Sequence, residues 1–233
     1  MIRRHFLAGT AACILLAACH SVPLPPDEPV TPEQARYLES RERMLKKFGR
    51  PGFELVVDAM KGQAFIAVDF FSEYAKRFYG KGRQTLRNGT MAVQSQPVPE
   101  RVRILWRDSS ASGEGNMPGI GGHQTGNIIG DEIIEVGSRI PQELIDDLKR
   151  DPKGNLRLKF RMSDQGTLFG WDIERRPGFD PKKRDQFGNI VYFPPVHSFA
   201  GGDFREAEII NGKPVRKGWY IDRHTGQKIE TDF

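Results

Sequence analysis

The stretch LRLKFRMSDQGTLFGWDIER, residues 156–175, decides the fold because it is typical of two strands joined by a tight turn. From Leu156 to Met162 apolar residues alternate with arginine and lysine, which is the pattern of a strand with one buried face. A single pairing register places apolar residues opposite apolar ones and opposite charges together. It pairs Met162 with Thr167, Leu158 with Trp171, Leu156 with Ile173, and Arg157 with Asp172. We therefore expect an antiparallel β-hairpin in this register.

Further strand signals lie on both sides of this hairpin. Residues 53–59 alternate in the same way, and Lys61-Gly62 offers a tight turn into residues 64–71, which predicts a second hairpin. More strands are expected at 102–106, at 128–136 and in a final hairpin that ends with 228–231. The segment 170–175 recurs in form as 218–223, which we interpret as two similar core strands.

Two segments carry helix signals. The first begins at Pro32, after the capping residue Thr31, and stops before Gly49. We expect it to pack on the domain, with a role in binding a partner or lying on lipid left open. The second covers residues 142–150. The chain is thus predicted to be α+β, mainly antiparallel β in sandwich-like sheets, with one long N-terminal helix and one short internal helix.

The residues before the first helix are typical of a bacterial lipoprotein. Arg3 and Arg4 precede an apolar run, residues 6–18, and the tetrapeptide at 16–19 closely resembles the lipobox that ends on a lipidated cysteine, here Cys19. The run is shorter than the roughly 20 apolar residues that a membrane-spanning helix needs. We expect residues 1–18 to be a cleaved signal, 19–31 a lipidated proline-rich tether, and 32–233 a single β-rich domain facing the periplasm.

Residues near the two ends of the signal indicate the membrane to which the protein is sent and the route of its export. His20 rather than aspartate follows Cys19, and this resemblance to exported lipoproteins implies the inner leaflet of the outer membrane. The paired arginines also resemble the twin-arginine export signal, so the export route is left open.

The cysteine content and charge balance of the mature chain exclude several kinds of site. Once the signal is removed, Cys19 is its single cysteine, and acylation of that thiol would exclude disulfides, thiol catalysis and cysteine metal sites. The mature chain would carry 33 basic and 30 acidic side chains, interspersed along its length, so no nucleic-acid surface is indicated.

No pattern of residues predicts catalysis or metal binding. The serines lie outside any Gly-x-Ser-x-Gly elbow, and no two histidines have the spacing of a metal site. The glycine-rich segment 119–126 lacks the Lys-Ser/Thr of a phosphate-binding loop. We therefore expect no catalytic residue, metal or cofactor, with an enzyme whose site is assembled only by folding as the weaker alternative.

Two long segments are candidates for binding a partner. Loops on a rigid sheet often carry recognition residues, and aromatic side chains often dominate binding energy. The segment 108–127 contains the candidates Glu114, Met117, His123 and Gln124. The proline-interrupted segment 189–204 cannot be a regular central strand, and it either covers the core at an edge or presents the candidates Tyr192, Phe193 and Phe199.

Three short motifs carry a resemblance to a known class. The segment 99–107, the helix start at 140–144 and the hairpin residues 168–171 resemble small proteobacterial lipoproteins of uncharacterised domain families, over roughly residues 53–176. Members of such families are often similar to immunity lipoproteins encoded beside type VI secretion effectors, notably antibacterial lipases. The resemblance implies a membrane-anchored inhibitor of a secreted toxin, with a phospholipase as the expected partner. The alternative is a structural or assembly lipoprotein of an envelope machine.

Overall fold

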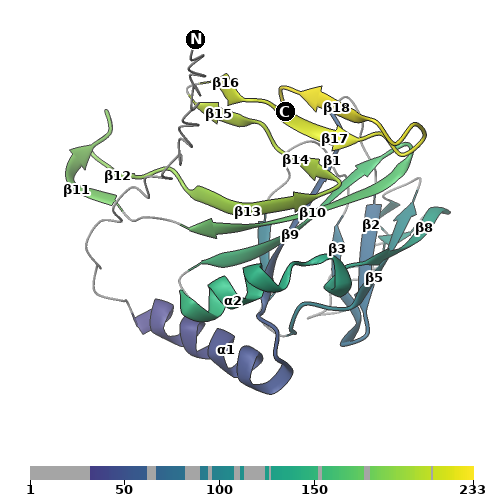
Figure 1. The fold of residues 1–233 in the computed structure, drawn as a ribbon, viewed down its shortest axis with the longest axis horizontal. Helices are drawn as coiled ribbons and strands as arrows, with labels where there is room; N and C mark the ends of the chain where they lie inside the picture. Colours follow the sequence, from purple (N-terminus) through teal and green to yellow (C-terminus); the bar gives the residue numbers. More distant parts are fainter. Residues whose placement is uncertain are drawn as a thin grey trace, which may run out of the picture.

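Two β-sheets and two α-helices make up most of the domain (Figure 1). The computed structural model describes residues 32–61, 67–81, 90–93, 96–107, 111–112, 124–125, 127–151, 154–175, 179–210 and 212–233. The expected α+β class with mainly antiparallel sheets is confirmed.

The larger sheet has five strands, with the sequence-predicted hairpin at its centre. Its order is β13 (Val196–Gly202), β10 (Gly166–Arg175), β9 (Asn155–Ser163), β1 (Phe53–Ala59) and β4 (Thr90–Val93). The pairing of β9 with β10 has the expected register, including Leu158 opposite Trp171 and Arg157 opposite Asp172. One pair, β1 with β9, is parallel.

The strand pairings of the second sheet show that one predicted hairpin is wrong. It contains β3 (Ala75–Lys81), β2 (Ala67–Ser72), β5 (Arg101–Arg107) and β8 (Ile128–Glu135), in that order. The hairpin expected between residues 53–59 and 64–71 is wrong, because β1 pairs with β4 and β9 while β2 pairs with β3 and β5. β1 lies inside the larger sheet, between β9 and β4, and six of its seven residues are buried. A turn signal at Lys61 does not reveal that the chain crosses to the other sheet.

The two sheets bury one shared hydrophobic core. Phe160 on β9 is 1% exposed, and its ring lies 5.2 Å from that of Phe70 on β2 and 5.1 Å from that of Phe169 on β10. The short helix α2 (Gln142–Arg150) adds Leu144, Ile145 and Leu148 to the same core, as its amphipathic pattern predicted. Phe160 thus connects the two sheets at the middle of the domain.

The first helix has the bounds expected from the sequence, but it is short and the description of a long N-terminal helix is wrong. α1 (Pro32–Phe48) has 17 residues, or about 25 Å at 1.5 Å per residue. It ends at Phe48, whose ring contacts Tyr74 edge to face at 5.8 Å, and the next residue, Gly49, has a positive φ of 70°. Among the residues that the structure describes, no helix is long and apolar enough to cross a bilayer.

The remaining strands form small additional sheets, and one of them corrects the repeat interpretation. A three-stranded sheet contains β14 (Phe204–Arg205), β17 (Gly218–Ile221) and β18 (Lys228–Thr231), and it confirms the final hairpin. Its strand β17 holds the second copy of the repeat, but Trp219 is only half-buried there, whereas Trp171 belongs to the core. Two-stranded pairs join β11 (Phe179–Arg184) to β12 (Ile190–Tyr192), β15 (Glu208–Ile210) to β16 (Lys213–Arg216), and β6 (Ala111–Ser112) to β7 (Gln124–Thr125).

The position of Phe160 leads to a stability prediction. Phe160→Ala should lower the free energy of unfolding by about 3–5 kcal/mol, because it removes ring contacts to both sheets and leaves a cavity. Urea unfolding followed by circular dichroism measures this change. Val215→Ala, at a side chain that is 58% exposed, is the control and should change stability by at most about 0.5 kcal/mol. Equal losses in the two variants would contradict a core position for Phe160.

Candidate partner-binding site at the β13 edge

Strand β13 forms one edge of the described five-stranded sheet and carries several exposed apolar side chains. Phe193, in the segment that leads into the strand, is 41% exposed, Val196 is 53% exposed and Phe199 is 43% exposed. We call these three residues the β13 surface. Apolar side chains gathered on one exposed segment are a feature of protein-binding surfaces, although single exposed apolar residues are common elsewhere.

The backbone at Phe199 distinguishes this surface from ordinary exposed apolar residues. Trp171 pairs with Gly201 and Ile173 pairs with Ser198, so two β13 residues stand opposite one β10 residue in a β-bulge. Phe199 lies in this bulge with a φ of +52°, the one positive value among non-glycine residues of the described chain. For a residue with a side chain this conformation costs about 1–2 kcal/mol.

Contacts on both sides of the bulge hold it in place. On the C-terminal side, a Cβ at Gly202 would lie 2.3 Å from the Phe169 carbonyl oxygen, so the backbones approach more closely than any side chain allows. On the N-terminal side, an Arg175 Nη1 donates to Ser198 Oγ at 3.2 Å and an Arg157 Nη2 donates to His197 Nδ1 at 2.9 Å. A strained residue persists where its neighbours determine the backbone in this way, and such strain is concentrated at functional sites.

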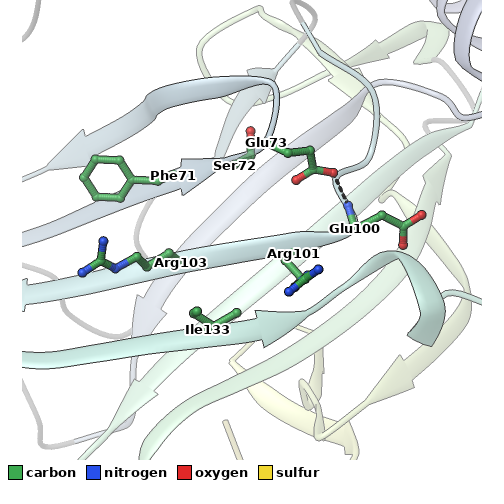
Figure 2. A pocket seen from close by; sticks show the side chains of 7 residues that line it. All are labelled: Phe71, Ser72, Glu73, Glu100, Arg101, Arg103 and Ile133. Carbon is green, nitrogen blue, oxygen red and sulfur yellow. Dashed lines mark hydrogen bonds between the residues drawn. The ribbon is translucent and has the colours of Figure 1, made fainter.

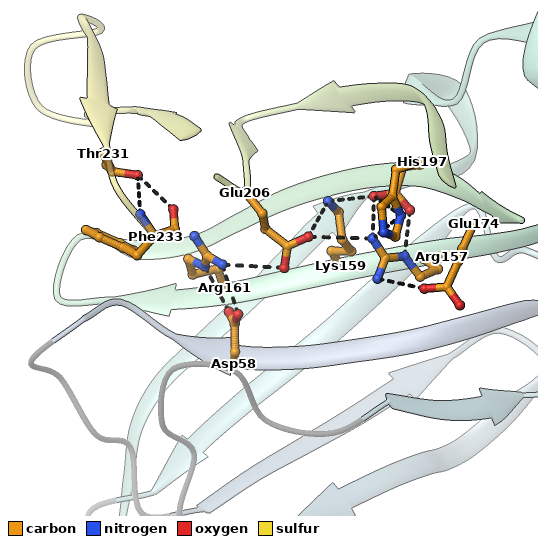
Figure 3. A network of polar contacts seen from close by, with 10 residues as sticks. Asp58, Arg157, Lys159, Arg161, Glu174, His197, Glu206, Thr231 and Phe233 are labelled. Carbon is orange, nitrogen blue, oxygen red and sulfur yellow. Dashed lines mark hydrogen bonds and ion pairs between the residues drawn. The ribbon is translucent and has the colours of Figure 1, made fainter. Parts of the chain in front are cut away.

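The Arg157 contact belongs to a charged network on the outer face of β9 (Figure 3). Arg157, Lys159 and Arg161 alternate with the core residues of β9, and all three are at most 8% exposed. Arg157 forms a bidentate pair with Asp172, at 2.6 Å for both bonds, and Arg161 forms one with Asp58, at 3.0 Å for both. The cations of β9 are therefore paired inside the protein.

The C-terminal part of the chain covers this network. Lys159 Nζ lies 3.0 Å from an Asp172 oxygen and 3.1 Å from an oxygen of Glu206, a half-buried residue that follows β14. The Arg161 guanidinium lies 4.5 Å from the ring centroid of Phe204, within the range of a cation–π contact. Residues from β1, β9, β10, β13 and the C-terminal segment therefore meet at one buried layer of charge (Figure 3).

Burial and pairing shift the pKa values in this layer in opposite directions. Burial would raise the pKa of the Asp172 carboxyl, but its interactions with His197 and Arg157 and the nearby positive charges hold that pKa well below its usual range. The pKa of Asp58 is raised, because burial outweighs the two hydrogen bonds from Arg161. The pKa of Glu206 is also lowered, because Lys159, Arg157 and Arg161 outweigh its burial, so the ionised forms of Asp172 and Glu206 stabilise the fold.

A second surface feature is a shallow hollow on the four-stranded sheet (Figure 2). It has a volume of about 440 Å³ and is lined by Phe71, Ser72, Glu73, Glu100, Arg101, Arg103 and Ile133. Its charged groups already have partners within the protein. Glu73 accepts the Glu100 backbone N–H at 2.5 Å, and Arg103 forms a bidentate pair with Asp131 at 2.7 and 2.5 Å. A ligand in the hollow would therefore have to compete with these existing bonds for the charged groups.

The structure brings together only some of the residues predicted from sequence. Phe193 and Phe199 are exposed and lie on or beside β13, as expected of an edge segment. Tyr192 ends β12, whereas Gln124 lies in β7 and so belongs to a different sheet. Cys19, Glu114, Met117 and His123 lie outside the described residues. The two predicted segments thus do not form one described site.

Sequence reasoning did not anticipate the buried layer of charge. The alternating arginine and lysine of β9 were expected to face away from the core, which is correct, but their burial under Glu206 and Phe204 depends on contacts with residues more than 40 positions away. The pairing of Arg157 with Asp172 was the available signal, because the predicted register placed these residues opposite one another.

Neither metal chemistry nor relatives assign a role to the β13 surface. Across the described ranges, no group of three or more His, Cys, Asp or Glu side chains is placed to hold a metal ion. Comparison with models of known families, with curated proteins and with solved structures found no match to this chain.

The bulge geometry predicts an unusual order of stabilities at Phe199. Phe199→Gly should be more stable than Phe199→Ala by about 1 kcal/mol, because glycine adopts a positive φ without a steric cost while alanine does not. At an ordinary strand position the order is reversed. Val196→Gly and Val196→Ala provide that comparison on the same strand. If alanine were the more stable substitution at both positions, the strained backbone at Phe199 would be contradicted.

The low pKa of Asp172 predicts a dependence of stability on pH. A carboxyl whose pKa is depressed by folding stabilises the protein above its unfolded pKa of about 4, and this contribution is lost as the pH falls through the folded value. Asp172→Asn should lower the free energy of unfolding at pH 7 by roughly 3 kcal/mol, because Arg157 and Lys159 lose a buried partner.

Denaturation curves between pH 7 and pH 3 measure this effect. The wild type should lose stability below about pH 4, and Asp172→Asn should lack that part of the loss. Asp131→Asn, which removes an exposed partner of Arg103, is the control and should have a much smaller effect at pH 7. Parallel pH profiles for the wild type and Asp172→Asn would show that Asp172 is not ionised and paired in the fold.

Proposed function

We propose that this protein is a lipid-anchored protein of the bacterial envelope that binds a toxin acting in the periplasm and neutralises it, and that the β13 surface contacts the toxin. The observation that carries the proposal is Phe199, whose aromatic ring is exposed from a strained β-bulge at a sheet edge. An exposed position with a positive φ favours glycine on stability alone. A phenylalanine there is best explained by a contact that the ring makes with a partner.

The chemistry of the surface fits a protein partner. Its three residues are apolar, two of them are aromatic, and aromatic side chains carry a large part of the energy at protein interfaces. The network beneath holds β13 before binding, so little conformational entropy is lost when a partner docks. Such a rigid aromatic anchor suits an inhibitor that must bind tightly.

The N-terminal sequence supports the location. A lipidated Cys19 followed by a tether would hold the domain at the membrane that a lipase-type toxin attacks. Tethering raises the local concentration of the inhibitor relative to its target, so inhibition needs less protein. The resemblance to immunity lipoproteins points to a secreted phospholipase as the partner.

The proposal predicts which protein the domain retains and through which residue. The mature chain carrying Cys19→Ser, used as bait in envelope extracts of cells exposed to the toxin, should retain a single secreted toxin after a salt wash. Phe199→Gly should reduce the amount retained about tenfold or more, as expected for an aromatic anchor worth at least 1.4 kcal/mol. Mass spectrometry identifies and quantifies the bound protein.

The control variant is Phe187→Ser, which removes an exposed phenylalanine that lies outside the β13 surface. It should retain the toxin as well as the wild type does. In cells, Cys19→Ala should reduce protection against the toxin while leaving toxin binding by the purified domain unchanged. Recovery of envelope-machine subunits in place of a toxin would contradict the proposal and favour an assembly role. An equal loss of retained toxin in Phe199→Gly and Phe187→Ser would show that the β13 surface is not the specific toxin contact.

A further inference from the structure

The hairpin formed by β11 and β12 presents the most exposed large apolar side chain of the described chain. Phe187, at the turn between these strands, is 78% exposed. Figure 1 shows the hairpin projecting from the body of the domain, beyond the end of β13. The residues at 182–190 are all exposed, so both the turn and the strand that leads into it are open to an external surface.

The turn that carries Phe187 is closed by hydrogen bonds around Asp185. The carboxylate of Asp185 accepts the backbone N–H groups of Phe187 at 2.8 Å and Asn189 at 2.9 Å, and the amide of Asn189 donates to it at 3.0 Å. These bonds hold the pKa of Asp185 below its usual range. Gly188 has a φ of 82° and completes the turn with a bond from its N–H to the Asp185 carbonyl at 3.0 Å. These bonds hold the backbone at Phe187, whose side chain is exposed.

A basic cluster lies immediately beside the exposed ring. Lys182, Lys183 and Arg184 are consecutive and exposed, and the neighbouring acidic residues in the sequence are Asp180 on the same strand and Asp185, which bonds within the turn. A projecting aromatic side chain next to three cations matches the chemistry of a phospholipid surface. The ring can enter the boundary between headgroups and acyl chains while the cations meet anionic headgroups.

We infer that the tip of the β11–β12 hairpin, with Phe187 and the basic residues 182–184, is a site that docks on a membrane containing anionic phospholipid. The inference rests on the proposed lipid anchor, because a lipid on Cys19 would keep the domain within the length of the tether. Twelve residues, 20–31, lie between Cys19 and Pro32, and the thirteen Cα-to-Cα steps between these two residues span at most about 45 Å. The second contact would then fix how the tethered domain is oriented.

The orientation has a consequence for the β13 surface. β12 leads directly into β13 through residues 193–195, so a hairpin tip resting on lipid would keep the β13 surface near the membrane. α1 and α2 lie on the other side of β9 and β10 from β13 (Figure 1). A toxin working on that membrane would then have the β13 surface within reach.

Binding to vesicles tests the inference without the acyl chain. The mature chain with Cys19→Ser should sediment with vesicles of phosphatidylglycerol and phosphatidylcholine and much less with phosphatidylcholine alone. Replacing Lys182, Lys183 and Arg184 together by glutamine should weaken binding to the mixed vesicles roughly tenfold or more, and Phe187→Ser should weaken it roughly threefold. Raising the salt concentration should reduce the charge-dependent part.

Matched variants separate this site from general electrostatic attraction and from toxin binding. The control for charge replaces Lys213, Arg216 and Lys217, three exposed basic residues of another strand region, by glutamine, and the control for the aromatic ring is Phe199→Gly. Both controls should bind vesicles as the wild type does, and all variants should remain folded at the assay temperature.

Three results would overturn the inference. These are absence of binding to the mixed vesicles, an equal loss in the control charge variant, and loss of toxin retention in Phe187→Ser. The last result would assign the hairpin to the toxin contact and would leave the proposed function standing. Loss of toxin retention in Phe199→Gly alone bears only on the proposed function.

Discussion

Strand β9 is the element on which the rest of the structure depends, because both of its faces are buried and they have opposite chemistry. Leu158, Phe160 and their apolar neighbours face the core between the sheets, whereas Arg157, Lys159 and Arg161 face a layer of carboxylates. A shift of the register by one residue would place three cations in the apolar core. Buried ion pairs often add little net stability to a fold. In β9, however, a shifted register would leave buried charges without partners, and this cost disfavours the wrong register.

The same layer of charge determines the shape of the β13 edge. Arg157 contacts both Asp172 on β10 and His197 on β13, so the register of the central hairpin and the position of the edge strand are linked by one guanidinium. Gly201 and Gly202 bring the other end of β13 against Trp171 and Phe169. With both ends held, the extra residue of the bulge is forced outward at Phe199, where strain and exposure coincide.

The two exposed aromatic residues to which we assign a role, Phe199 and Phe187, have backbones that are held in different ways. Phe199 is fixed by tertiary contacts around a bulge, whereas Phe187 is fixed by a local turn around Asp185. Exposed basic residues lie beside Phe187, whereas Arg157 and Arg175, which contact β13, form ion pairs within the domain, and the β13 surface is apolar. This difference in neighbouring charge is why we assign one ring to a protein partner and the other to a lipid surface.

The sequence by itself determined the features whose causes are local. The alternation in residues 156–175 was sufficient for the register of β9 and β10, and the amphipathic pattern of residues 142–150 was sufficient for α2 and its buried face. The aromatic content of residues 189–204 was sufficient to select Phe193 and Phe199 as candidates, and both are exposed. Only the tertiary structure decided the parallel pairing of β1 with β9, the burial of the β9 cations under Glu206 and the positive φ of Phe199. These features arise from contacts between residues far apart in the chain, and alternation within a strand shows which residues share a face but not which segment covers that face.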